Sequence, residues 1–190
     1  MKCKTCGEAL VTRRLPIYED DALIGLPHIF IIDAAEQRWC KKCQCEYGVA
    51  IPDEEGLEAA VAMARVHVPV KLTGREIRFL RRAISYPAKA VATYLQTSQE
   101  TVSRWENGHL PIGPQPDKLF RILVARRLAK SHPWVSLNYE EDVLLEMEIP
   151  SQVGNEPPPL VRMAFARVLA RVANQPPQET WYPKPTDKAA

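Results

Sequence analysis

Apolar residues recur at helical spacing in the middle of the chain. In the range Glu54–Val66, the side chains of Leu57, Val61 and Ala64 fall on one face, and Asp53 stands where an N-cap belongs. This pattern predicts a helix that links an N-terminal part of the chain to a central part.

Residues 71–130 predict a series of short helices, because the apolar stretches are short and are separated by prolines and glycines. Thr73 and Glu76 have the spacing of a capping box, so the first helix of this series begins there and continues to about Ile84. The segment therefore predicts a compact all-α domain.

Other patterns flank this region. The β-prone runs Ala9–Leu15 and His28–Ile32 predict short strands near the N-terminus. Near the C-terminus, Leu160–Ala173 carries apolar residues at helical spacing and predicts an amphipathic helix. The end of the chain, from 176 to 190, is rich in proline and charge and predicts disorder.

The composition and the distribution of charge add two expectations. The chain has no apolar run long enough for a membrane helix and no signal peptide at its start, so we expect a cytoplasmic protein with no membrane partner. Charge is uneven: residues 71–130 hold twelve basic and four acidic residues, a net charge of +8, whereas residues 1–70 and 131–190 each have a net charge of −3. The basic centre predicts a polyanionic partner.

The cysteines form two C-x2-C pairs, Cys3 with Cys6 and Cys40 with Cys43. In the reducing cytoplasm this pattern favours a metal site over disulfides, and four thiolates are a tetrahedral ligand set for a structural Zn²⁺. Cys45 is a competing ligand by proximity, but we expect it to be an ordinary thiol, because a C-x-C pair wraps a metal poorly. The four histidines have no ligand spacing.

The run from Val91 to Gly108 resembles the helix-turn-helix of Xre-type (Cro/repressor-like) regulators. Small Ala92 allows two helices to pack closely, Ser98 can cap the second of them, and Gly108 can end it. The apolar positions that supply the shared core are Val91, Leu95, Val102 and Trp105.

The outward positions of the second helix are polar, as a helix that enters the major groove requires. They are Gln99, Glu100, Thr101, Ser103 and Arg104. We expect Gln99, Glu100 and Arg104 to read bases, with Arg104 suited to a bidentate contact to guanine, and Thr101 and Ser103 to serve phosphates or packing. Lys89 or Arg75 can supply a phosphate contact, because only a nearby cation is needed.

Together the patterns predict a mainly α chain with a small N-terminal β zinc-binding module and a central helix-turn-helix domain. The expected parts are a four-Cys zinc module (1–52), a linker helix (53–70), the DNA-binding domain (71–130), an extension that serves dimerisation or docking (131–175) and a disordered tail (176–190).

The order of the two cysteine pairs, the linker helix and the Xre-type domain resembles the MqsA family of antitoxins, whose N-terminal half is called the YgiT-type zinc finger. The resemblance covers about residues 1–130. It implies a zinc module that neutralises a ribonuclease toxin, and a homodimer that represses its own operon at a palindrome. Arg104 matches the family's base-contacting arginine, whereas Glu100 stands where the family has a contacting Asn, so a different operator is expected.

Two functions follow as hypotheses: an antitoxin that represses its own operon and binds a toxin, or a stand-alone transcription regulator that has no toxin partner. In the second hypothesis, the zinc module and the C-terminal segment serve dimerisation or effector sensing. The expected partners are double-stranded DNA and a second copy of the chain. The sequence gives no support for an enzyme, since it offers no nucleophile with a partnered base, no phosphate-cradling glycine loop and no open metal position.

Overall fold

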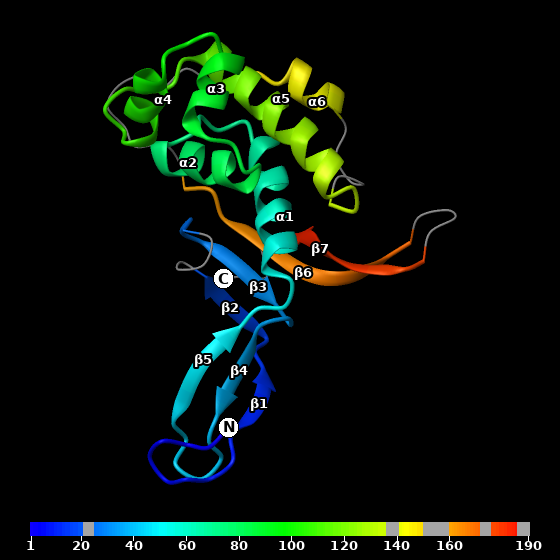
Figure 1. The fold of residues 1–190 in the computed structure, drawn as a ribbon. Coiled ribbons are helices and arrows are strands. Elements are labelled where there is room, and N and C mark those ends of the chain that lie inside the picture. Colours follow the sequence, from blue (N-terminus) through cyan, green and yellow to red (C-terminus); the bar gives the residue numbers. More distant parts are fainter. Residues whose placement is uncertain (21–24, 136–140, 150–159, 172–175, 186–190) are drawn as a thin grey trace.

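The computed structural model describes residues 1–20, 25–135, 141–149, 160–171 and 176–185. In these residues it contains six helices and seven strands arranged in two sheets. The fold is therefore α/β, and the expectation of a mainly α chain with a single small β module is wrong. The helices lie at one end of the molecule, the four-stranded sheet lies in the middle, and the three-stranded sheet lies at the other end (Figure 1).

The three-stranded sheet consists of β1 (Val11–Arg14), β4 (Glu36–Trp39) and β5 (Glu46–Ala50), in the order β1-β4-β5. Its strands are antiparallel. No residue in these three strands is fully buried. The sheet thus has almost no hydrophobic core of its own.

The four-stranded sheet joins the two ends of the chain. It consists of β2 (Ile17–Asp20), β3 (Ile29–Ile32), β6 (Met163–Ala170) and β7 (Gln178–Lys184), in the order β2-β3-β6-β7. β3 and β6 are parallel, with Ile29 opposite Met163, and the other pairs are antiparallel. The C-terminal strands therefore complete a sheet that begins near the N-terminus.

The C-terminal segment differs in two places from the structure that its sequence predicts. The helix expected over Leu160–Ala173 is wrong, because Met163–Ala170 is β6, and the disorder expected from 176 onwards is wrong for Gln178–Lys184, which is β7. β6 is held between two strands and begins with three consecutive buried residues. A strand buried on both faces is apolar without strict alternation, so its sequence resembles that of an amphipathic helix.

Helix α1 (Glu54–Val66) has Asp53 as its N-cap, as predicted, and the Asp53 side chain accepts a hydrogen bond from the Gly56 backbone N–H. α1 packs against β6 and β7 (Figure 1). Trp181 of β7 is almost fully buried and donates a hydrogen bond from its indole Nε1 to the Asp53 carbonyl at 3.0 Å. The linker helix is thus part of the core and connects the sheet to the helical end.

The remaining helices are α2 (Gly74–Ala83), α3 (Ala88–Tyr94), α4 (Gln99–Glu106), α5 (Pro114–Ser131) and α6 (Glu141–Glu146). The predicted capping box at Thr73 and Glu76 is present at the start of α2. Ser98 caps α4, and Gly108 follows it with a φ of 72°. The helices expected over residues 71–130 are therefore present, but α5, with 18 residues, is not short.

Two buried arginines fix α1 relative to the helical end. Arg65 of α1 and Arg121 of α5 both donate hydrogen bonds to the Val68 and Val70 carbonyls, at 2.6 to 3.3 Å. Both side chains are fully buried. The segment between α1 and α2 is consequently held by side chains from both sides, so it is not a free linker.

Candidate metal centre and nucleic-acid surface

The two cysteine pairs lie on loops with the same backbone design. In the first loop, Gly7 N–H donates to the Cys3 carbonyl at 3.0 Å, and in the second, Gln44 N–H donates to the Cys40 carbonyl at 2.9 Å. Gly7 and Gln44 both have positive φ, 74° and 60°. This repeated turn directs both thiols of each pair toward the same point. Gln44 is not a glycine, so its left-handed backbone conformation lowers the stability of the fold by about 1 kcal/mol.

The four cysteine sulfurs form one cluster. All four Sγ atoms lie within 4.8 Å of one another, and none is in a disulfide. The Cys3–Cys43 and Cys6–Cys40 separations are both 3.4 Å, and Cys6–Cys43 is 3.7 Å. Four thiolates at about 2.3 Å from a tetrahedral metal are about 3.8 Å apart, so this cluster fits a metal ion with little rearrangement.

Tyr47 of β5 supports the first pair and was not predicted as a site residue. Its hydroxyl donates a hydrogen bond to Cys3 Sγ at 3.2 Å and accepts one from the Lys4 backbone N–H at 2.8 Å. The hydrogen bond from Tyr47, together with weaker effects of the backbone N–H groups of Thr5 and Cys6, lowers the pKa of Cys3 to about 5. The backbone N–H of Cys43 lowers the pKa of Cys40 as well. Both effects favour the thiolate form, which binds metals.

Cys45 lies outside the cluster. Its Sγ is 3.6 Å from the Thr5 hydroxyl and 3.8 Å from the Cys43 carbonyl. Its position in the second loop corresponds to that of Glu8 in the first, since both carbonyls accept the N–H of the loop's first cysteine. Cys45 therefore contributes to the backbone hydrogen bonding of the second loop, and its sulfur is not part of the four-sulfur cluster.

The helix-turn-helix consists of α3, the turn after it and α4. Val91, Ala92, Val102 and Trp105 are buried between these helices and their neighbours. Gln96 in the turn has a φ of 51°, the left-handed conformation for which glycine is the usual residue. Local packing thus holds α4 at a fixed angle while its other face stays exposed.

The outward side of α4 carries the side chains predicted to meet DNA. Gln99, Glu100, Ser103 and Arg104 are exposed, and Thr101 is half-buried, with its hydroxyl 3.1 Å from that of Ser98. The backbone N–H of Glu100 and the Ser98 hydroxyl lower the pKa of the Glu100 carboxyl. Across the described part of the chain, Arg104 makes no side-chain hydrogen bond or ion pair. The polar face is therefore continuous, and its arginine is available to a ligand.

The two predicted phosphate contacts lie in different places. Lys89 is exposed in the first turn of α3, within the helix-turn-helix. Arg75 follows Gly74 at the start of α2, and a Cβ on Gly74 would lie 2.6 Å from the Trp105 carbonyl oxygen. Arg75 thus stands beside the C-terminal end of α4, at the opposite end from Gln99.

Two arginines of α2 have partners at the C-terminal end of α4. Arg81 forms an ion pair with Glu106 at 2.5 Å, and Arg78 donates to the Asn107 side chain at 2.6 Å. These contacts hold α2 against α4, so the positive charges of Arg78 and Arg81 stabilise the packing of the two helices.

Comparison with protein-family models, with curated proteins and with solved structures finds no match. Among the described helices, none combines the length and apolar character needed to cross a lipid bilayer.

Proposed function

We propose that the protein is a sequence-specific DNA-binding repressor that binds a palindromic operator as a homodimer and is stabilised by a structural Zn²⁺. The observation that carries this proposal is the outward face of α4: polar, continuous, and supported by the buried Val102 and Trp105. A short helix held in this way can enter the major groove with its N-terminal residues toward the bases.

Specific roles follow from the position of each side chain. Arg104 can make a bidentate contact to guanine, and Gln99 and Glu100 lie at the N-terminal end of α4, where base edges come within reach. Lys89 is the better placed phosphate contact, because Arg75 lies at the far end of α4.

The metal has a structural role in this proposal. Cys3, Cys6, Cys40 and Cys43 supply four sulfurs, which complete a tetrahedron around Zn²⁺ and leave no position for a water or substrate. The ion would hold together a sheet whose strands contain no fully buried residue.

The decisive experiment is selection and sequencing of random duplexes bound by the purified zinc-loaded chain. We expect a palindromic motif, and Arg104→Ala should lose about 1 to 3 kcal/mol of discrimination at one base position in each half-site. Arg82→Ala is the matched control, because Arg82 is an exposed arginine on α2 and should leave the motif unchanged. Light scattering on the free and DNA-bound chain measures the dimer.

One result contradicts the proposal outright. If the chain binds all duplexes equally and weakly at moderate salt, and Arg104→Ala binds as the parent does, α4 is not a reading helix. Weak binding that depends only on salt would reflect the basic charge alone.

The antitoxin role is the finer part of the proposal and rests on the resemblance to the MqsA family. Its test is co-expression with a small ribonuclease encoded by the adjacent gene, where the chain should bind that ribonuclease and abolish its activity. A stand-alone regulator is the second candidate. It is favoured by the residues beyond 130, which lie outside the resemblance and supply β6 and β7 to the sheet beside the metal-binding end.

A further inference from the structure

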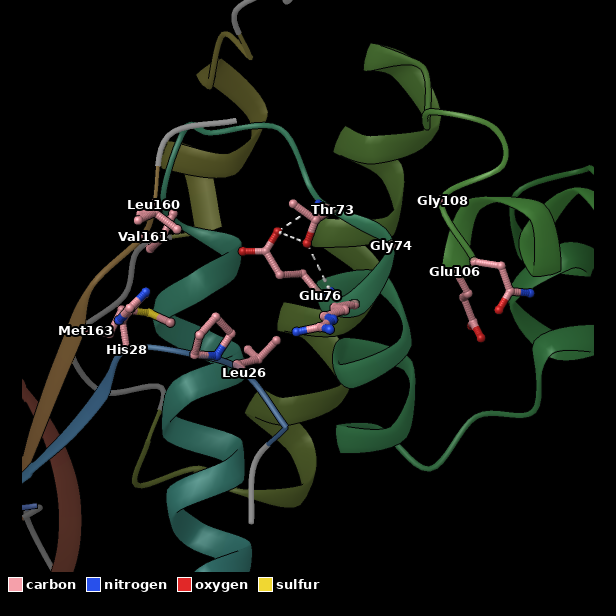
Figure 2. A pocket seen from close by; sticks show the side chains of 13 residues that line it. Leu26, His28, Thr73, Gly74, Glu76, Glu106, Gly108, Leu160, Val161 and Met163 are labelled. Atoms are coloured by element: carbon pink, nitrogen blue, oxygen red, sulfur yellow. Dashed lines mark hydrogen bonds between the residues drawn. The ribbon is translucent and has the colours of Figure 1, made fainter. Parts of the chain in front are cut away.

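A pocket lies where the four-stranded sheet meets the helix-turn-helix domain. Its volume is about 430 Å³, within the usual range for small-molecule sites. One wall comes from residues 26–28, just before β3, and from Leu160, Val161 and Met163 at the start of β6. The other wall comes from the start of α2 and the end of α4 (Figure 2). No residue of this pocket belongs to the metal cluster or to the outward face of α4.

The wall on the sheet side is apolar. It is formed by Leu26, Pro27, Leu160, Val161 and Met163. Leu160 is 74% exposed at the mouth, whereas Met163 is buried. Such a surface favours a ligand with a hydrocarbon or aromatic body, since its burial removes apolar area from water.

The negative charges on the helix side are already paired. Glu76 binds the buried Arg65 and the Thr73 hydroxyl, and Figure 2 shows its contacts with Thr73. Glu106 pairs with Arg81 of α2 at 2.5 Å. Neither carboxylate is available to attract a cationic ligand.

The two basic side chains that line the pocket differ in whether they have a partner. The His28 ring is 3.0 Å from the Glu19 carboxylate. Arg75 is exposed, lines the pocket and, throughout the described ranges, has no side-chain hydrogen bond or ion pair. Among the described lining residues it is therefore the charged group left to meet a ligand, and a guanidinium prefers carboxylates and related oxyanions.

We infer that this pocket binds a small amphiphilic organic anion, whose apolar body packs between the sheet and the helices and whose carboxylate or sulfonate pairs with Arg75. A ligand in this place contacts the N-terminal turn of α2 and the C-terminal end of α4 together with the ends of β3 and β6. The inference does not depend on the DNA-binding proposal, because it can be tested without DNA.

The test uses two fluorescent probes that share an apolar body. One is 1-anilinonaphthalene-8-sulfonate, which carries an anion, and the other is N-phenyl-1-naphthylamine, which does not. With the full zinc-loaded chain we expect saturable binding of one sulfonate probe per chain, and Arg75→Gln should weaken it at least tenfold while changing the affinity for the neutral probe less than twofold. Arg82→Gln is the control, because it removes an exposed arginine of the same helix outside the pocket.

A blocking variant locates the site. Val161→Trp should abolish the binding of both probes, and near-UV circular dichroism should show that this variant keeps its fold; if it does not fold, the comparison of Arg75→Gln with Arg82→Gln decides. The inference is overturned if the sulfonate probe shows no saturable binding, if both arginine variants behave alike, or if Arg75→Gln weakens both probes equally.

Discussion

Tyr47 shows that the candidate metal centre extends beyond its cysteines. Its hydroxyl lies between the Cys3 sulfur and the Lys4 N–H, so it orients the first loop and favours the thiolate at the same time. A cysteine pair can be recognised from its spacing. A partner 44 positions away along the chain is revealed only when β5 brings it to the loop.

Replacing this tyrosine tests its contribution. Tyr47→Phe keeps the ring and removes the hydrogen bond to Cys3, so we expect zinc affinity to fall by about 10-fold to 100-fold, as for other groups that orient metal ligands. Competition with a chromophoric chelator measures the affinity. Tyr94→Phe, at an exposed tyrosine of α3, should have no effect. Equal affinities for the two variants would leave Tyr47 without a role in metal binding.

Between elements, α2 and α4 approach each other closely at Gly74. A Cβ there would lie 2.6 Å from the Trp105 carbonyl oxygen and 2.8 Å from that of Glu106. Gly74→Ala therefore forces α2 away from α4, and we expect a loss of about 1 to 3 kcal/mol in the free energy of unfolding. Gly48→Ala is the control, because nothing lies within 4 Å of its Cβ. Urea denaturation measures both, and a Gly74→Ala chain as stable as the parent would contradict the predicted close packing.

A second prediction about the packing of the helices concerns the buried ion pair between Asp117 and Arg121. Asp117 is fully buried, pairs with Arg121 at 2.5 Å and accepts a hydrogen bond from the Leu72 N–H at 3.0 Å. Asp117→Ala leaves the Arg121 charge buried without its partner, which should cost about 3 to 5 kcal/mol. Gln115→Ala, in the same turn of α5 and exposed, should change stability little. A small loss for Asp117→Ala would mean that water reaches Arg121.

Elements that begin with local signals were predicted well, and elements that depend on distant partners were not. Asp53, Thr73 and Ser98 each cap a helix through a neighbour three residues away, and such signals are visible in the sequence. β6 instead owes its conformation to β3, more than 130 residues earlier. The apolar spacing of Leu160–Ala173 suits a helix equally well, so without knowledge of β3 the pattern could not decide.

At the scale of the whole molecule, the parallel pairing of β3 with β6 joins parts that the sequence suggested were separate. Ile29 and Ile31 of β3 are fully buried, and Trp181 of β7 anchors the start of α1. Removing the residues after 130 would uncover this core. If a chain truncated after residue 130 lost its dimer, the loss would therefore reflect damage to the fold as well as removal of an interface. The dimer has to be measured on the full chain.

If the four cysteines hold Zn²⁺, as proposed, the two sheets should respond differently to its removal, because they are stabilised in different ways. β1, β4 and β5 contain no fully buried residue, and the loops that carry the four cysteines precede β1 and connect β4 to β5. In contrast, β3 has three consecutive buried residues, Ile29, Phe30 and Ile31. Without metal, the cysteine loops lose the bonds that hold the three-stranded sheet together. The four-stranded sheet and α2 to α5 keep their own cores.

Hydrogen exchange measured by mass spectrometry separates these outcomes. After zinc is removed with a strong chelator, we expect peptides covering β1, β4 and β5 to exchange as freely as unfolded chain, while those covering β3, β6 and α5 stay protected. Cys6→Ser should reproduce this pattern without chelator, and Cys45→Ser should not, since Cys45 lies outside the sulfur cluster. Loss of protection spread evenly over the molecule would mean that the metal supports the whole fold. Unchanged protection in β1, β4 and β5 would mean that backbone pairing alone holds the three-stranded sheet together.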